Sequence, residues 1–167
     1  MAFSSSVAPC LEATDVDAAN VAFALAEVLG AQEADPLPLR PLALPPLPTG
    51  AMSLPKVGQA IAALMPEDAI MVDEAITSAR PIIDATMGAR GHDVLCLMGG
   101  AIGDGLPTAV GAAVACPDRK VVALMGDGSA MYTLQSLWTM ARERLDVTGE
   151  VFANRGYQIL RGELANV

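Results

Sequence analysis

Residues 121–129 read VVALMGDGS, and residues 151–156 read VFANRG. In each segment, apolar residues typical of a buried strand are followed by polar residues and glycine. The 25 residues from 129 to 153 are enough for one crossover helix and a return strand. Two neighbouring parallel strands would then bring Asp127 and Asn154 to one edge of a sheet, where open α/β sheets bind ligands. Carboxylate and carboxamide oxygens beside glycines favour Mg²⁺ carrying a diphosphate.

The composition predicts a globular domain with a buried core. The chain has 167 residues, of which 53% are hydrophobic and 4% aromatic. Its net charge of -9 argues against nucleic acid or an anionic membrane as the main partner. The three cysteines lack metal-ligand spacing and predict reduced thiols in a cytoplasmic protein. No apolar stretch is long enough to span a bilayer, and no signal peptide is recognisable.

From residue 53 onwards, strand and helix patterns alternate. Ser53 is placed to cap a helix that ends at Pro66. The segments that follow predict strands at 69–72, 94–98, 120–125 and 147–153, and helices at 77–87, 106–115 and 132–144. This alternation predicts an α/β fold, a parallel sheet with helices on both faces.

Several apolar side chains of the expected helix 132–144 are assigned to the core. Met131 and Met140, like Met125, are expected to fill gaps there. Trp138, with Leu134 and Leu137, is expected to mark the packed face of that helix.

The N-terminal part of the chain has a different character. A helix beginning at Asp15 or Asp17 is expected to end at Gly30. A proline-rich stretch, 36–48, follows, and its proline density excludes helix and central strand. The leucines between the prolines suggest a strap lying on an apolar surface, with a polyproline ligand for a partner as the alternative. They are Leu37, Leu39, Leu42, Leu44 and Leu47.

The glycine-rich segment 99–105 is a second candidate for ligand binding. Its four glycines lie between a strand and a helix, where they permit positive φ and close approach of another molecule. A tight turn for helix packing is the alternative. A Rossmann dinucleotide site is disfavoured, because the glycine spacing does not match G-x-G-x-x-G. Ile102 is unusual in such a turn.

Asp127 alone could simply cap a helix, but with Asn154 a ligand site is favoured.

A family resemblance covers about residues 50–167. The segment 99–147, GGAIGDGLPTAVGAAVACPDRKVVALMGDGSAMYTLQSLWTMARERLDV, resembles the cofactor domain of thiamine-diphosphate enzymes. The segments VDEAITS (72–78) and FANRGYQIL (152–160) add to the match. Within this family the chain is most similar to the acetolactate synthase and benzoylformate decarboxylase group. The resemblance implies the thiamine-diphosphate-binding fold, with thiamine diphosphate and Mg²⁺ as cofactors.

The resemblance also implies individual roles. Asp127 and Asn154 would bind Mg²⁺ through their side chains, and Gly156 through its carbonyl oxygen. Ile102 would be the apolar wedge beneath the thiazolium, and Leu160 would lie near the entrance. The residues implied to hold or line the cofactor are Thr77, Ser78, Gly100, Ala101, Ile102, Gly126, Gly128, Ser129 and Tyr157.

Two departures from the family pattern stand out. Gly149 and Glu150 interrupt a strand that should be central and apolar, and a buried glutamate without a partner is costly. The chain also offers no candidate for the general-base glutamate, which the resemblance places in another domain, so no catalytic residue is assigned. We therefore expect residues 1–30 to be the tail of a middle domain and 31–50 a linker. Residues 51–167 would be a cofactor domain that is truncated at its C-terminus.

The resemblance implies an enzyme that decarboxylates a 2-oxo acid and then either joins the product to a second 2-oxo acid or releases it. A benzoylformate decarboxylase-like lyase is one alternative, and a non-catalytic fragment or interaction module is another. The expected partners are the 2-oxo acid substrate and the pyrimidine-binding domain of another subunit, within a homo-oligomer.

Overall fold

The computed structural model describes residues 24–30 and 41–166. The chain divides into two units, Met1–Leu39 and Arg40–Val167. In the first unit, residues 24–28 are helical, and Gly30 follows with a φ of +62°. A glycine with positive φ is a common helix terminator, so the predicted stop at Gly30 is confirmed. The predicted start of this helix lies outside the described residues.

The second unit contains a sheet of four parallel strands. They are β1 (Ala69–Glu74), β2 (His92–Cys96), β3 (Val121–Gly126) and β4 (Val147–Phe152), in the order β2-β1-β3-β4. All three pairings are parallel. The central strands β1 and β3 are almost fully buried, whereas the edge strands β2 and β4 are largely exposed.

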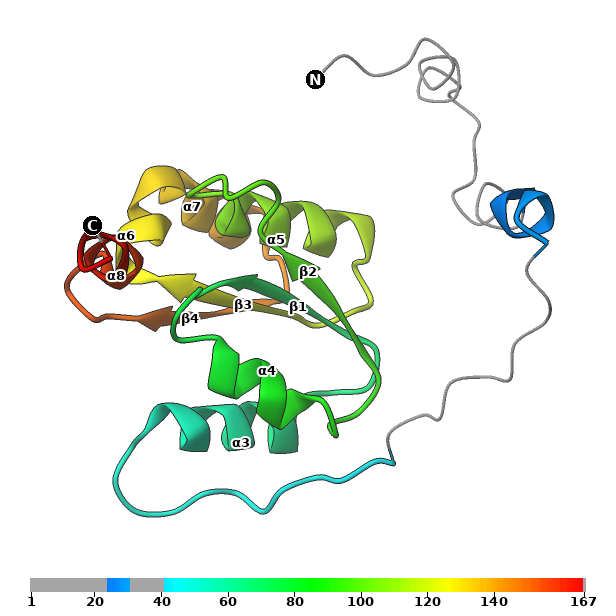
Figure 1. Ribbon diagram of the computed structural model, residues 1–167, viewed down its shortest axis with the longest axis horizontal. Coiled ribbons are helices and arrows are strands. Elements are labelled where there is room, and N and C mark those ends of the chain that lie inside the picture. The colour runs from blue at the N-terminus through cyan, green and yellow to red at the C-terminus, as the bar shows by residue number, and fades with distance from the viewer. Residues whose placement is uncertain (1–23, 31–40, 167) are drawn as a thin grey trace, which may run out of the picture. The chain divides into compact units, whose positions relative to one another are not determined.

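Helices cover both faces of this sheet (Figure 1). Helices α3 (Leu54–Leu64) and α4 (Arg80–Thr86) lie on one face, and α5 (Gly105–Ala115) and α7 (Gln135–Glu143) on the other. Shorter elements follow β3 and β4: α6 (Asp127–Ala130), η1 (Met131–Thr133) and α8 (Gln158–Leu164). The predicted α/β fold with a parallel sheet and helices on both faces is confirmed.

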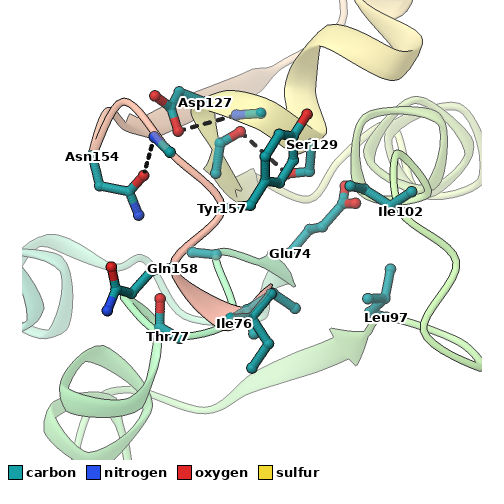
Figure 2. Close-up of a pocket in the computed structure, with 15 residues that line it drawn as sticks. Glu74, Ile76, Thr77, Leu97, Ile102, Asp127, Ser129, Asn154, Tyr157 and Gln158 are labelled. Atoms are coloured by element: carbon teal, nitrogen blue, oxygen red, sulfur yellow. Dashed lines mark hydrogen bonds between the residues drawn. The ribbon is translucent and has the colours of Figure 1, made fainter. Parts of the chain in front are cut away.

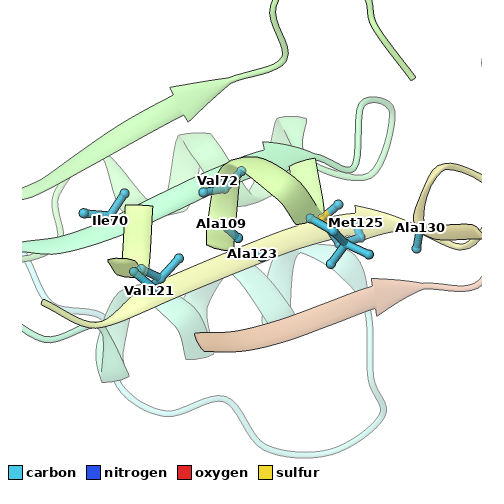
Figure 3. Close-up of a cluster of buried hydrophobic side chains, with 9 residues drawn as sticks. Ile70, Val72, Ala109, Val121, Ala123, Met125 and Ala130 are labelled. Atoms are coloured by element: carbon cyan, nitrogen blue, oxygen red, sulfur yellow. The ribbon is translucent and has the colours of Figure 1, made fainter. Parts of the chain in front are cut away.

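Alternation along β3 explains the two core layers. Successive side chains of a strand point to opposite faces, so Val121, Ala123 and Met125 pack toward α5, as Figure 3 shows. Val122 and Leu124 belong to the other layer, with residues of α3 and α4. Because both layers must be apolar, β3 reads as a continuous hydrophobic run rather than an alternating one.

Some helix boundaries differ from the sequence expectation. Helix α4 begins at Arg80 rather than 77, because residues 76–79 form turns. The expected helix 132–144 is divided into η1 and α7. Ser53 occupies the N-cap position of α3 but makes no capping hydrogen bond through its side chain. None of the described helices is long and apolar enough to cross a membrane.

The expectation that Glu150 occupies a central, buried strand is wrong. Its strand β4 is at the edge of the sheet, and residues 148–151 are exposed. The carboxylate therefore keeps its hydration and does not pay the cost of burial. Glu150 and Gly149 do not prevent β4 from pairing with β3 as far as its last residue, Phe152, two residues before Asn154.

The expected packing of α7 is also wrong in part. Trp138 is 63% exposed, and Leu134 and Leu137 are nearly half exposed. The Trp138 ring stacks instead with Arg142, whose guanidinium carbon lies 4.5 Å from the ring centroid. The methionines were expected to fill gaps in the core. Met125 is buried there, but Met131 is 66% exposed.

The proline-rich strap is only partly described. In residues 41–49, which have no regular structure, the backbone N–H of Ala43 donates a 2.8 Å hydrogen bond to the carbonyl oxygen of Gly88. However, Leu42, Leu44 and Leu47 are all exposed, so they are not covered by an apolar surface of the residues that the structure describes. Leu37 and Leu39 lie outside the described residues.

Candidate functional site

The carboxyl ends of β1, β3 and β4 surround one pocket of about 90 Å³. Figure 2 shows the polar side chains Asp127 and Asn154 on one side of it and the apolar side chains Ile76, Leu97 and Ile102 on another. In parallel strands all carboxyl ends meet at one sheet edge, and ligands of open α/β sheets bind there. The pocket therefore lies where the sequence predicted a ligand site.

Asp127 connects the ends of two strands. It is the first residue of α6, directly after β3. One carboxylate oxygen accepts a 3.0 Å hydrogen bond from the N–H of Gly128, and the other accepts a 2.9 Å bond from the N–H of Arg155, beyond β4. This second bond holds the loop after β4 against the start of α6. Asn154 is thereby held near Asp127.

The side chain of Asn154 has a local role in the same loop. Its amide oxygen accepts a 3.0 Å hydrogen bond from the N–H of Gly156 (Figure 2). Arg155, between them, has a φ of +56°, a left-handed conformation. A carbonyl or carboxylate oxygen has two lone pairs. The oxygens of Asp127 and Asn154 can therefore bind a cation while they keep these hydrogen bonds.

The start of α6 offers a backbone N–H group to an anion. The N–H groups of a first helical turn have no partner within the helix. That of Gly128 donates to the Asp127 carboxylate, so that of Ser129 remains for an anion. The Ser129 hydroxyl is used locally, donating a 3.1 Å hydrogen bond to the Gly126 carbonyl oxygen. Ser129 itself is only 8% exposed.

Tyr157 lies directly against Gly128. A Cβ on Gly128 would come within 2.7 Å of the Tyr157 ring, so only glycine permits this contact. Burial raises the pKa of the Tyr157 phenol, and Tyr132 and the negative charge of Asp127 raise it further. A phenol is neutral at physiological pH in any case, because its ordinary pKa is about 10. The Tyr157 hydroxyl lies beside the start of α6, close to Gly128.

The glycine-rich turn contributes Ile102 to the pocket. Gly99, Gly100 and Gly103 all have positive φ, which confirms that this segment needs glycine for its conformation. Ile102 is 44% exposed. Glu74 fixes the conformation of the turn. Its carboxylate accepts hydrogen bonds from the N–H group of Gly103 and, at 2.7 Å, from that of Gly105.

Most, but not all, of the residues assigned from sequence line this pocket. Those that do are Thr77, Ile102, Gly126, Asp127, Gly128, Ser129, Asn154, Gly156 and Tyr157. Ser78, Gly100 and Ala101 do not line it, and neither does Leu160, which is exposed in α8. Gly100 and Ala101, which the resemblance implied to line the cofactor, are therefore not part of this pocket.

Sequence reasoning missed several lining residues, of which Glu74 is the most informative. Glu74 is the last residue of β1, and Asp127 comes directly after β3. Both are carboxylates at the end of an apolar run, so the same sequence signal could have identified Glu74. Ile76, just beyond, has a φ of +48°, an outlier for a β-branched residue. Leu97, Gln158 and Ile159 also line the pocket, and no pattern in the sequence distinguishes them.

The donor set of the pocket fits Mg²⁺ bound together with a diphosphate. Mg²⁺ is commonly held by one or two carboxylates plus phosphate oxygens and water. Among the described residues, no group of three or more His, Cys, Asp and Glu side chains could hold a metal ion. Of the two carboxylates that line the pocket, Glu74 is bonded to the N–H groups of Gly103 and Gly105. Asp127, the Asn154 carboxamide oxygen and backbone carbonyls remain, and this set leaves coordination positions for phosphate.

This chain is similar to known thiamine pyrophosphate enzymes. Residues 85–166 match the model of the family "Thiamine pyrophosphate enzyme, C-terminal TPP binding domain". A Mycobacterium tuberculosis protein, whose name describes it as a candidate acetolactate synthase large subunit, IlvX, is 54% identical over 123 residues. That match covers 74% of this chain and 24% of the relative. An alpha-keto-acid decarboxylase of M. tuberculosis is 53% identical over 62 residues, which are 37% of this chain and 11% of the relative.

Two solved decarboxylase structures are also similar to this chain. The thiamine diphosphate-dependent 4-hydroxybenzoylformate decarboxylase of Rhodococcus jostii RHA1 is 31% identical, with a TM-score of 0.63. The match covers 86% of this chain and 28% of that structure. Benzoylformate decarboxylase from Polynucleobacter necessarius is 27% identical, with the same TM-score, over 76% of this chain and 25% of its own. The chain thus spans about a quarter of the length of these proteins.

Proposed function

We propose that this chain, whose residues 85–166 match the C-terminal TPP-binding domain of the thiamine pyrophosphate enzymes, belongs to that family and that its pocket binds thiamine diphosphate together with Mg²⁺. The observation that carries the proposal is the 2.9 Å hydrogen bond from the Arg155 N–H to the Asp127 carboxylate. This bond brings the polar ends of β3 and β4 to one pocket. The side chains of Asp127 and Asn154, with the Gly156 carbonyl, would hold the metal.

The diphosphate would lie at the start of α6. There the N–H group of Ser129 favours an anion, since that of Gly128 already donates to the Asp127 carboxylate, and the metal would neutralise the remaining charge. Ile102, partly exposed in the pocket, would pack against the flat heteroaromatic rings of the cofactor. Tyr157 would line the diphosphate side, where its neutral phenol can donate a hydrogen bond.

The proposed reaction is the decarboxylation of a 2-oxo acid. When bound, the cofactor supplies the electron sink that allows carboxylate to leave as CO₂. The residues of this chain bind and orient that cofactor. The relatives are named both as a synthase and as decarboxylases. We favour an acetolactate synthase-like reaction, in which the product joins a second 2-oxo acid, because the 54% identity extends over 74% of the chain. A benzoylformate decarboxylase-like lyase is the alternative.

We also propose that another polypeptide completes the site, as a pyrimidine-binding domain of a second subunit in a homo-oligomer. Two features support this. Gly100 and Ala101 are exposed and do not line the pocket. The described part of the chain also exposes large apolar side chains, among them Met98 at 76%. Size-exclusion chromatography of the chain with its cofactors should give assemblies larger than a monomer, and a purely monomeric profile would contradict this proposal.

Calorimetric titration with thiamine diphosphate, with and without Mg²⁺, tests cofactor binding directly. The wild-type chain should bind only when Mg²⁺ is present, and Asp127→Ala should abolish binding. Asp118→Ala is the matched control, because Asp118 is an exposed carboxylate in the loop between α5 and β3 and does not line the pocket. A folded wild-type chain that does not bind, or equal binding by Asp127→Ala, would refute the proposal.

A further inference from the structure

Glu74 is a fully buried carboxylate at the base of the pocket. Its exposure is 1%, and it lines the pocket together with Ile102 (Figure 2). A buried ionised carboxylate is costly unless it is hydrogen-bonded or paired. Among the described residues, none of the salt bridges involves Glu74. The stabilisation of this side chain must therefore come from hydrogen bonds.

Those hydrogen bonds all go to one short segment. One oxygen of Glu74 accepts the N–H of Gly103, and the other accepts the N–H of Gly105 at 2.7 Å. The two amides flank Asp104, in the turn immediately after Ile102. A carboxylate is suited to this task because both of its oxygens accept hydrogen bonds, whereas a glutamine would present one acceptor and one donor.

The same turn is held from its other side by η1. The hydroxyl of Thr133 donates a 2.8 Å hydrogen bond to the carbonyl oxygen of Gly103. A Cβ at Gly103, which has a φ of +90°, would come within 2.6 Å of the Tyr132 Cβ. Gly103 is therefore fixed between β1 and η1, and the position of Ile102 is determined by the residue that follows it.

We propose that Glu74 is a positioning residue that sets how far Ile102 projects into the pocket. The inference rests on the proposed cofactor site, because the ligand that Ile102 would contact is the ring system of thiamine diphosphate. Glu74 acts through the turn and does not itself touch the diphosphate end. Its removal should therefore weaken contacts with the rings and spare those made by Asp127 and Gly128.

The hydrogen bonds can be tested without any ligand by amide hydrogen exchange, measured by NMR on the wild-type chain. The amides of Gly103 and Gly105 should exchange at least tenfold more slowly than that of Gly100, which is exposed in the same turn. Glu74→Gln should remove this protection. Exchange of Gly103 and Gly105 in the wild-type chain as fast as that of Gly100 would overturn the inference, even if the variant fails to fold.

The effect on the ligand is tested with two probes that share a diphosphate, thiamine diphosphate and inorganic pyrophosphate, each with Mg²⁺. Glu74→Gln should lower the affinity for thiamine diphosphate at least tenfold and that for pyrophosphate less than twofold. A general loss of structure would weaken both equally. The matched control is Asp73→Asn, which removes a neighbouring carboxylate of β1 outside this pocket and should change neither affinity.

Equal loss of both affinities in Glu74→Gln, or no loss of either, would overturn the proposed role. A wild-type chain that binds neither probe would overturn the proposed function. Glu74 would then have no role in positioning the cofactor. The amide exchange of Gly103 and Gly105 would still decide whether Glu74 holds the turn. The two failures are therefore distinguishable.

Discussion

Two glycines of helix α5 should respond in opposite directions to the same substitution by alanine. Gly105, the first residue of the helix, is buried, and Gly111 is exposed in the helix interior. A Cβ on Gly105 would lie 2.5 Å from the Met125 Cε and 2.7 Å from a Glu74 carboxylate oxygen. A Cβ on Gly111 would meet no atom within 4 Å.

The magnitudes follow from these surroundings. Overpacking a core costs about 1–3 kcal/mol. If Glu74 is displaced, its buried hydrogen bonds with Gly103 and Gly105 are lost, and leaving such a group unsatisfied costs about 1–3 kcal/mol. Gly105→Ala should therefore lower the free energy of unfolding by about 2–4 kcal/mol. Gly111→Ala should raise it by about 0.5–1 kcal/mol, because alanine is the better helix former.

Urea denaturation followed by circular dichroism measures both effects in the full chain. With a urea dependence of about 1–3 kcal/mol per M, the Gly105→Ala midpoint should fall by about 1 M or more, and the Gly111→Ala midpoint should rise slightly. Because both variants add the same methyl group to the same helix, their difference isolates the local packing. Equal midpoints, or shifts in the same direction, would refute the close packing of Gly105 against Glu74 and Met125.

Three further predictions concern the core, the sheet edge and pH. Met125→Ala should lower the unfolding free energy by about 2–5 kcal/mol, whereas exposed Met131→Ala should change it by less than about 0.5 kcal/mol; similar values for both would contradict their different burial. Glu150→Ala should also stay within about 0.5 kcal/mol in urea denaturation, and a large gain would indicate that Glu150 is buried after all. Burial raises the pKa of Asp73 above 3.8, so its ionisation costs stability as pH rises from 3.8 through that raised pKa. Asp73→Asn should therefore be more stable than wild type near pH 7, and this gain should disappear near pH 3; a gain at pH 3 that is lost at pH 7 would show the opposite shift.

Much of the fold could be predicted because local patterns act over short distances. The continuous apolar run of β3 predicted a strand buried on both faces, and Val121 and Val122 indeed belong to different core layers. Strands that alternate with helices form parallel sheets, whose carboxyl ends meet. That rule alone predicted that Asp127 and Asn154 would meet at one edge.

The predictions of buried side chains were wrong where burial depends on the order of the strands in the sheet. The run 147–153 was expected to be central, but it forms the edge strand β4, so Glu150 is exposed. Likewise, a helix pattern shows that Trp138 and Leu137 share a face with other apolar residues, but not whether another element covers that face. In the described part of the chain Trp138 is largely exposed and Leu137 nearly half exposed.

The sequence by itself determined the fold class, the elements and the sheet edge at which a ligand site would form, because these follow from periodicity and from glycines next to apolar runs. Only the tertiary structure decided which carboxylate became structural. Glu74 and Asp127 both occur where an apolar strand ends, yet Glu74 is buried against amides 29 and 31 residues away, while Asp127 reaches the loop after β4. The strand order β2-β1-β3-β4 brings these distant backbone groups within hydrogen-bonding distance, and no local pattern records such contacts.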